Sequence, residues 1–216
     1  MPSITLHQVV PIPLSDRLEK RTSQIWNTDI VLKQGEWIKI KASSGSGKTT
    51  LVHILYKLRN DYKGNVLYGN QNIQAIPAEA LASIRQKSIS IIFQDLRLFP
   101  QLTAFENIQL KNILGGVMYT EKEIMLMVER LQITHIIQHK AQTLSYGEQQ
   151  RVAIIRALMQ PFEWLIMDEP FSHLDINNAT LAAQLITEEC TKRNAGFILT
   201  DLDNDTHFVY TQQLNL

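Results

Sequence analysis

The feature that most constrains this chain is a segment in which a strand pattern, a glycine- and serine-rich loop and a helix pattern follow one another. Residues 37–41 alternate apolar and polar side chains as a strand does, and residues 49–60 have helical periodicity. Between them, residues 42–49 read Ala-Ser-Ser-Gly-Ser-Gly-Lys-Thr, which matches the P-loop pattern except at Ala42, where the pattern has glycine. A methyl group is tolerated there if the backbone does not need a positive φ. The apolar face of the predicted helix consists of Leu51, Ile54, Leu55 and Leu58.

Each part of this loop has a role in holding a nucleotide. Gly45 and Gly47 let backbone N–H groups turn inward around an anion, and the following helix presents its positive end. Lys48 can neutralise the outer phosphates of ATP, and the Thr49 hydroxyl can hold Mg²⁺. The alternative is that a glycine-rich turn lies beside a lysine by chance. The candidate nucleotide-binding residues of the loop are Ser43, Ser44, Gly45, Ser46, Gly47, Lys48, Thr49 and Thr50.

A second acidic motif follows an apolar strand pattern at residues 164–167. Asp168 and Glu169 end this run, which places two carboxylates at the carboxyl edge of the sheet, where open α/β folds bind ligands. We expect Asp168 to join Thr49 at Mg²⁺ and Glu169 to polarise the attacking water as a general base. Two adjacent acids at a strand end can also be a solvated edge, and the nearby P-loop pattern favours the catalytic interpretation.

Strand and helix patterns together predict an α/β fold with a mostly parallel sheet, the core of a P-loop NTPase. The short apolar runs 88–93, 164–167 and 196–200 are typical of strands buried on both faces. Thr120 and Glu123 form a capping box before an amphipathic helix pattern. We expect one domain over 1–216, with at most two more edge strands after Asp205. Its predicted parts are a core (36–95 and 160–205), an N-terminal antiparallel β part (1–35 and 64–70) and an inserted helical lobe (96–150).

Composition excludes several classes of function. The 21 basic and 21 acidic residues balance, so no net field attracts nucleic acid, and we expect no nucleic-acid partner. No signal peptide and no apolar run approaching roughly 18 residues is present, so a cytoplasmic protein is expected. Cys190 is the only cysteine, which excludes an internal disulfide and a zinc site built from cysteines. It is expected to be a small buried residue on a late helix.

Three further motifs resemble those of ABC-type ATPases. Residues 144–151, Leu-Ser-Tyr-Gly-Glu-Gln-Gln-Arg, resemble the signature sequence of that family and lie between the P-loop and Asp168. Gln94 resembles the Q-loop glutamine, and residues 172–175, Ser-His-Leu-Asp, resemble the D-loop. Residues 93–107 look most like the small bacterial ATPases of the lipoprotein-releasing, macrolide-export and cell-division groups. Import ATPases for amino acids have a similar Q-loop sequence, so the resemblance leaves the cargo open.

The resemblance implies a head-to-tail dimer with a second copy or a homologous ATPase subunit, in which the signature of one subunit binds the ATP of the other. Ser145, Gly147 and Asp175 would then contact nucleotide, and Gln94 would serve both Mg²⁺ and catalysis beside Lys48 and Glu169. It also implies an integral membrane permease on a separate chain, so the protein would lie peripherally on the inner face of the plasma membrane. An apolar set in the lobe is predicted to be either part of the permease groove or lobe core: Phe99, Leu102 and Phe105.

The sequence departs from the family pattern at three places. Pro13 stands where an aromatic usually stacks on adenine, with Trp26 as a possible substitute or a packing residue. Tyr146 replaces a usual glycine of the signature, which would strain a backbone of positive φ. Asp201 replaces the switch histidine, and a carboxylate repels the γ-phosphate.

Asp201 leaves two interpretations of activity. We favour slow ATP hydrolysis that drives the permease, because the other motif residues are present. The alternative is an ATP-responsive dimerisation module with little or no turnover. A third class, soluble ABC proteins of repair or translation that act on nucleic acid, generally has large insertions and basic surfaces, which this short and neutral chain lacks.

Overall fold

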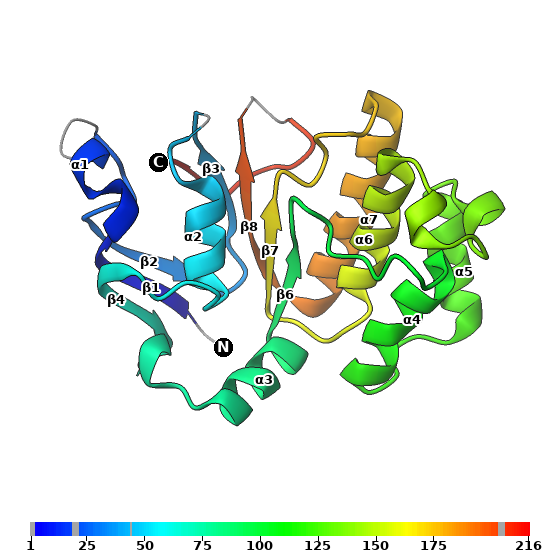
Figure 1. The fold of residues 1–216 in the computed structure, drawn as a ribbon, viewed down its shortest axis with the longest axis horizontal. Helices are drawn as coiled ribbons and strands as arrows, with labels where there is room; N and C mark the ends of the chain where they lie inside the picture. The colour runs from blue at the N-terminus through cyan, green and yellow to red at the C-terminus, as the bar shows by residue number, and fades with distance from the viewer. Residues whose placement is uncertain (1–2, 19–21, 44, 203–205) are drawn as a thin grey trace.

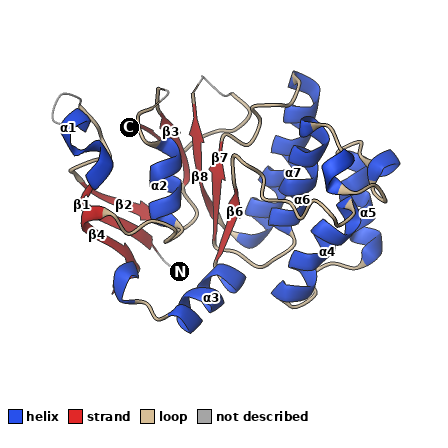
Figure 2. Ribbon diagram, viewed as in Figure 1, coloured by secondary structure: helices blue, strands red, loops and turns tan. Residues whose placement is uncertain are grey.

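The computed structural model describes residues 3–18, 22–43, 45–202 and 206–216, and contains a parallel and an antiparallel sheet (Figures 1 and 2). The parallel sheet has the strand order β6-β7-β8-β3-β9 and the antiparallel sheet the order β2-β1-β4-β5. The strands are β1 (Ser3–Pro11), β2 (Asp29–Lys33), β3 (Trp37–Lys41), β4 (Tyr62–Tyr68), β5 (Gln71–Asn72), β6 (Ile89–Ile92), β7 (Trp164–Asp168), β8 (Gly196–Asp201) and β9 (Gln212–Asn215).

Helices cover both faces of the parallel sheet. In Figure 1, α2 lies between the two sheets, α6 and α7 lie on the other side of the parallel sheet, and α4 and α5 lie beyond them. The α-helices are α1 (Ser15–Leu18), α2 (Lys48–Leu55), α3 (Ala78–Lys87), α4 (Ala104–Gly115), α5 (Glu121–Arg130), α6 (Tyr146–Leu158) and α7 (Ile176–Arg193). Short 3-10 turns are η1 (Ile12–Leu14), η2 (Ile73–Ala75), η3 (Thr134–Ile136) and η4 (Ala141–Thr143).

The alternation of side chains along β7 divides the interior into two cores. Trp164 and Ile166 belong to the core between the parallel sheet, α2 and the antiparallel sheet. Leu165 and Met167 point to the opposite face and belong to the core shared with α6 and α7. A strand buried on both faces must be apolar throughout, which is why its pattern was recognisable in the sequence.

The parallel arrangement brings the candidate residues together, because every strand of this sheet ends at the same edge. The P-loop follows β3, Gln94 follows β6, and Asp168 and Asp201 end β7 and β8. After residue 205, one further strand, β9, pairs in parallel with β3 at the sheet edge, as predicted. The predicted antiparallel strands are also confirmed.

The prediction of the first long helix was wrong at its end. It extends over Lys48–Leu55, and Leu58 lies outside it with 39% of its surface exposed. Lys57 has a positive φ of 54°, and the N–H of Leu58 donates to the carbonyl of His53. This closing turn ends the helix before Leu58 could join its apolar face.

The helical region between the strands contains α4, α5, η3 and η4. The predicted capping box is present: the backbone N–H of Thr120 donates to Glu123 at 2.8 Å. The apolar cluster that contains Ile124 and Val128 continues without a break to Leu165 and the face of the parallel sheet. Because α6 extends to Leu158, it crosses the predicted end of the lobe at residue 150, and the proposed division into parts stays a prediction.

Two smaller expectations concern single features. Cys190 is fully buried in α7, as expected, and burial raises the pKa of its thiol to about 12. In the described ranges, none of the helices combines the length and the hydrophobicity that crossing a membrane requires.

Candidate nucleotide-binding site

The P-loop follows β3 and turns into α2 through two glycines of positive φ. Gly45 has φ of 73° and Gly47 φ of 105°, conformations that glycine adopts without a steric cost. Ala42 is buried and is not among the residues of positive φ, so its methyl group is accommodated as expected. The loop is closed by the Ser46 side chain, which donates to the carbonyl of Ser43 at 2.7 Å. Ser44 lies outside the described residues.

Trp26 supports this loop from below. Only 3% of Trp26 is exposed, and its indole N–H donates to the carbonyl of Ser46 at 3.4 Å. A Cβ on Gly47 would lie 3.4 Å from the Trp26 ring and 2.7 Å from Leu14. Of the two alternatives for Trp26, these contacts favour the packing residue, because its buried ring lies against the backbone of the P-loop.

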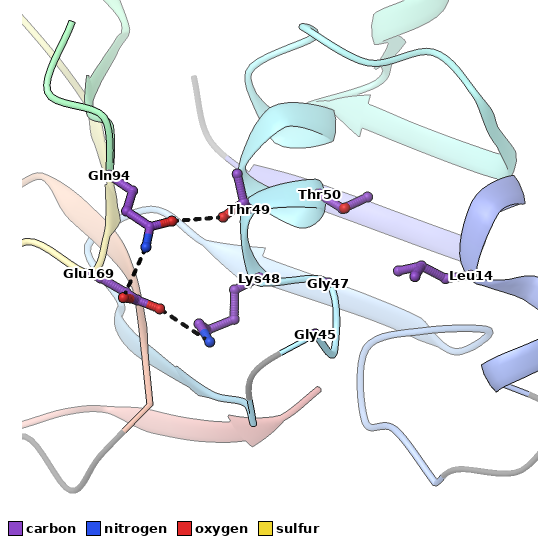
Figure 3. A pocket seen from close by; sticks show the side chains of 8 residues that line it. All are labelled: Leu14, Gly45, Gly47, Lys48, Thr49, Thr50, Gln94 and Glu169. Carbon is purple, nitrogen blue, oxygen red and sulfur yellow. Dashed lines mark hydrogen bonds and ion pairs between the residues drawn. The ribbon is translucent and has the colours of Figure 1, made fainter.

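A cavity of about 370 Å³ opens above the loop (Figure 3). Pro13 is exposed and does not line this cavity, whereas Leu14, which ends η1, does. Leu14 was missed because no motif marks it and only the fold brings it opposite Gly47. The lining residues are Leu14, Gly45, Gly47, Lys48, Thr49, Thr50, Gln94 and Glu169.

Four side chains form a connected polar network along one wall of the cavity. Figure 3 shows Gln94 between Thr49 and Glu169, and Lys48 on the other carboxylate oxygen of Glu169. The Thr49 hydroxyl donates to Gln94 Oε1 at 3.3 Å, and Gln94 Nε2 donates to Glu169 Oε2 at 3.2 Å. Lys48 Nζ lies 3.2 Å from Glu169 Oε1, and both side chains are about nine-tenths buried. The structure therefore brings the three predicted catalytic residues, Glu169, Gln94 and Lys48, into contact.

Glu169 has a left-handed backbone conformation, with φ of 48°. Its N–H donates to the carbonyl of Thr200 at 3.0 Å, and its carbonyl accepts from Gln150 Nε2 at 3.3 Å. A non-glycine residue in this conformation costs free energy and is held only where surrounding bonds fix it. These contacts aim the Glu169 side chain at the P-loop.

Asp168 is 2% exposed and accepts a hydrogen bond of 2.6 Å from the Thr200 hydroxyl. It lines a second cavity, of about 330 Å³, that shares Thr49 and Gln94 with the first. The predicted metal ligands Thr49, Gln94 and Asp168 thus border one space and supply hydroxyl, amide and carboxylate oxygens, the donors that Mg²⁺ prefers. The remaining residues that line the second cavity are His53, Asp95, Tyr146 and His173. Burial lowers the pKa of His53.

The signature residues lie apart from the first cavity. Ser145 caps α6, and Glu148 Oε2 accepts from both its N–H and its hydroxyl, at 2.8 and 2.7 Å. The hydrogen bond from the Ser145 side chain holds the pKa of Glu148 below its usual value. Gly147 lies in the first turn of α6, and Asp175 caps α7 by accepting from Asn178 N–H at 2.8 Å. Neither Ser145, Gly147 nor Asp175 lines the cavity over the P-loop of this chain.

Two of the departures from the family pattern now have a structural description. Tyr146 is the first residue of α6 and is not among the residues of positive φ, so its side chain causes no strain there. Asp201 ends β8 beside the P-loop, where its carbonyl accepts from Ala42 N–H and its carboxylate accepts from Leu202 N–H. Neither His207 nor His173 occupies the position of the switch histidine in the sequence: the His207 ring packs on Phe171 and the His173 ring on Tyr146.

The three apolar residues of the lobe do not share one environment. Phe99 is 54% exposed, whereas Phe105 packs against the core cluster of the lobe. Leu102 is partly buried. These environments favour a core role for Phe105 and leave Phe99 exposed, and the prediction of a permease groove stays a prediction.

Comparison with known proteins decides the family. The family model described as ABC transporter matches residues 25–172. The chain belongs to the ABC transporter family. The lipoprotein-releasing system ATP-binding protein LolD of Pseudoalteromonas translucida is 34% identical over 81% of this chain and 76% of that protein. LolD of Geobacter metallireducens is 32% identical over 84% and 81%.

Solved ABC transporter structures agree with this assignment. The dimeric structure of MJ0796, a bacterial ABC transporter cassette, has a TM-score of 0.75 and 29% identity, over 91% of this chain and 87% of that one. A dimeric post-hydrolysis state of MJ0796 bound to ADP and Pi has a TM-score of 0.77 and 27% identity, over 93% and 88%. The predicted P-loop NTPase fold and the prediction of an ABC-type ATPase subunit that binds ATP are confirmed.

Proposed function

We propose that two copies of this chain, or this chain and a homologous ATPase subunit, assemble head to tail on Mg-ATP and drive a separate membrane permease. This proposal rests mainly on one observation. Lys48, Gln94 and Glu169 form a network within one chain, while Ser145 and Gly147 do not line the cavity over the P-loop of that chain. A second chain would supply these signature groups to the nucleotide. The dimeric form of the related cassette MJ0796 supports this arrangement.

The side chains of the network have separate roles in hydrolysis. Glu169 would accept the proton of the attacking water, and Lys48 would offset charge on the transferring phosphoryl group. Thr49, Gln94 and Asp168 would hold Mg²⁺, which when bound supplies positive charge beside the phosphates. Because Lys48 is paired with Glu169, the phosphates must first draw Lys48 away, and this frees the Glu169 carboxylate to act as a base.

Nucleotide binding would rest on the P-loop more than on the base. The backbone N–H groups of residues 43–48 and the amino end of α2 would hold the phosphates, with Thr50 at the side toward Leu14 (Figure 3). Leu14 is the apolar residue at that edge of the cavity, and it offers adenine an aliphatic contact in place of an aromatic stack.

Asp201 is the reason to expect slow turnover. It ends β8 at the edge where the phosphates would bind, and a carboxylate can only accept hydrogen bonds there. Slow hydrolysis is favoured because Glu169 and its partners are in place. The same observation supports the second candidate, a module that dimerises on ATP with little or no hydrolysis.

The proposed partner is an integral membrane permease on another chain. The similar proteins are named as the ATP-binding protein of a lipoprotein-releasing system, which supports a role as one component of a larger assembly. Through the permease the chain would lie at the inner face of the plasma membrane, with Phe99 as an exposed contact candidate.

Phosphate release by the purified chain with Mg-ATP tests the proposal. The parent is compared with Glu169→Gln and Asp201→His, and dimerisation is followed by light scattering. We expect slow release by the parent, none by Glu169→Gln with dimerisation retained, and faster release by Asp201→His. A silent parent that Asp201→His activates would instead establish the dimerisation module, and release unaffected by Glu169→Gln would refute its role as the base.

A further inference from the structure

Tyr146 makes two contacts that a glycine at this position could not make. Its hydroxyl donates to the backbone carbonyl of Gln94 at 2.9 Å, and its ring lies 4.2 Å from the ring of His173 in an edge arrangement. The first turn of α6, which carries Ser145 and Gly147, is therefore tied to two loops of the same chain. These are the loop after β6 and the loop that follows Glu169.

The contact leads directly to the nucleotide site. The main chain of Gln94 accepts from Tyr146, while its side chain bridges Thr49 and Glu169. The two cavities share Gln94 and Thr49, and Tyr146 borders the second one together with Asp168. Any shift of the Gln94 main chain would therefore act on Tyr146, which lies in the first turn of α6.

A second connection reaches the same turn from the other side. Gln150, one turn further along α6, is buried and donates to the carbonyl of Glu169 at 3.3 Å, and it accepts from His173 N–H at 3.1 Å. His173 also lies against the Tyr146 ring. The start of α6 thus contacts both Gln94 and Glu169 of the catalytic network, through Tyr146 and Gln150 respectively. Tyr146 is the more exposed of these two links.

We propose that Tyr146 is a positioning residue that couples the nucleotide site of one subunit to that subunit's own signature turn. Nucleotide at Thr49, Gln94 and Glu169 moves the Gln94 main chain, and Tyr146 passes this movement to Ser145 and Gly147. The biological meaning of this inference rests on the proposed function. In the proposed dimer, Ser145 and Gly147 would contact the ATP of the other subunit. Tyr146 would then link the two ATP sites.

Tyr146→Phe isolates the hydroxyl, because it keeps the ring against His173 and the helix start. A hydrogen bond of this kind changes an equilibrium roughly two- to tenfold. The matched control is Tyr210→Phe, which removes a hydroxyl near the amino end of the parallel sheet, where Tyr210 packs on Phe197. Each substitution is expected to raise the unfolding equilibrium constant no more than two- to tenfold, so both variants stay folded under the conditions of the measurements.

The deciding measurement is hydrogen exchange of peptides covering residues 144–152, with and without Mg-ATP, at a protein concentration where light scattering shows monomer. We expect Mg-ATP to slow exchange in the parent and in Tyr210→Phe. In Tyr146→Phe this response is lost, while peptides covering the P-loop still respond. An equal response in Tyr146→Phe, or no response in the parent, would overturn the inference.

A second measurement separates this inference from the proposed function. In a Glu169→Gln background, Tyr146→Phe is expected to raise the dissociation constant of the Mg-ATP dimer two- to tenfold, with unchanged ADP affinity of the monomer. Absence of any dimer would count against the proposed function alone, because the exchange measurement is made on monomer. A dimer of unchanged affinity would show that Tyr146 does not position the signature.

Discussion

Replacing Thr200 by valine removes one buried hydrogen bond at nearly constant shape. Thr200 is fully buried on β8, and its hydroxyl donates to Asp168 Oδ1 at 2.6 Å. A hydrogen bond to a charged group contributes about 1.5–3 kcal/mol, and its loss leaves a carboxylate of 2% exposure without this donor. We expect Thr200→Val to lower the free energy of unfolding by about 2 kcal/mol and, in a domain of this size, the midpoint temperature by about 4 to 8 °C.

Urea unfolding followed by tryptophan fluorescence measures this loss, with two comparison variants. Thr200→Ser keeps the donor and removes only a methyl group, so it should cost about 1 kcal/mol. Thr180→Val removes a partly exposed hydroxyl that donates to a carbonyl within α7, and it should change stability by less than about 0.5 kcal/mol. If Thr200→Val matches the parent, or is more stable than Thr200→Ser, the hydrogen bond to Asp168 does not stabilise the edge of the sheet.

Four further substitutions, one of them a comparison variant, test other parts of the molecule. Burial lowers the pKa of Lys111 to about 8, so the folded protein binds this proton less tightly than the unfolded chain, and the parent gains stability as pH rises through 8 toward 10.5. In urea unfolding, the free energy of unfolding of Lys111→Met should therefore exceed that of the parent by more at pH 7 than at pH 9.5. A difference between the two proteins that is the same at both pH values would contradict this. Gly64→Ala places a Cβ 2.4 Å from the carbonyl oxygens of residues 7 and 8 and should cost more than about 3 kcal/mol in thermal unfolding. Gly116→Ala, with a similar φ and open space around its Cβ, should cost about 1 kcal/mol, and equal losses would show that only backbone conformation matters. Leu14→Ala should weaken Mg-ATP binding roughly three- to tenfold by titration calorimetry, and unchanged affinity would rule out the aliphatic contact with adenine.

Local patterns in the sequence were sufficient for the elements that carry the chemistry. The strand at Trp37–Lys41 and the buried strand before Asp168 follow from short runs of side chains, because burial on one or both faces imposes a recognisable order. The rule that open α/β sheets bind ligands at their carboxyl edge placed Glu169 at the site, whereas Gln94 was identified only by its resemblance to the Q-loop of ABC-type ATPases.

The features that the sequence did not reveal depend on contacts between distant segments. Trp26 and Leu14 meet the P-loop only because the antiparallel sheet and η1 bring them to Gly47. Their own neighbours in sequence carry no sign of this contact. The hydrogen bond from Tyr146 to the carbonyl of Gln94 joins residues 52 positions apart. The sequence showed that Tyr146 departs from the signature motif, but it could not show that Gln94 is its hydrogen-bond partner.

The ion pair between Lys48 and Glu169 sets the order of events in the proposed reaction. Both groups are about nine-tenths buried, where separating a pair without replacing its partner is costly. The polyphosphate of ATP carries several negative charges and can replace the single carboxylate beside Lys48, so phosphate binding itself releases Glu169 as a base. Asp201 adds a further carboxylate at the same edge of the sheet, beside the P-loop residue Ala42. In the proposed reaction it would oppose the arrival of the phosphates without offering them a donor. We therefore expect binding of ATP to release the proposed base, and turnover to be slow.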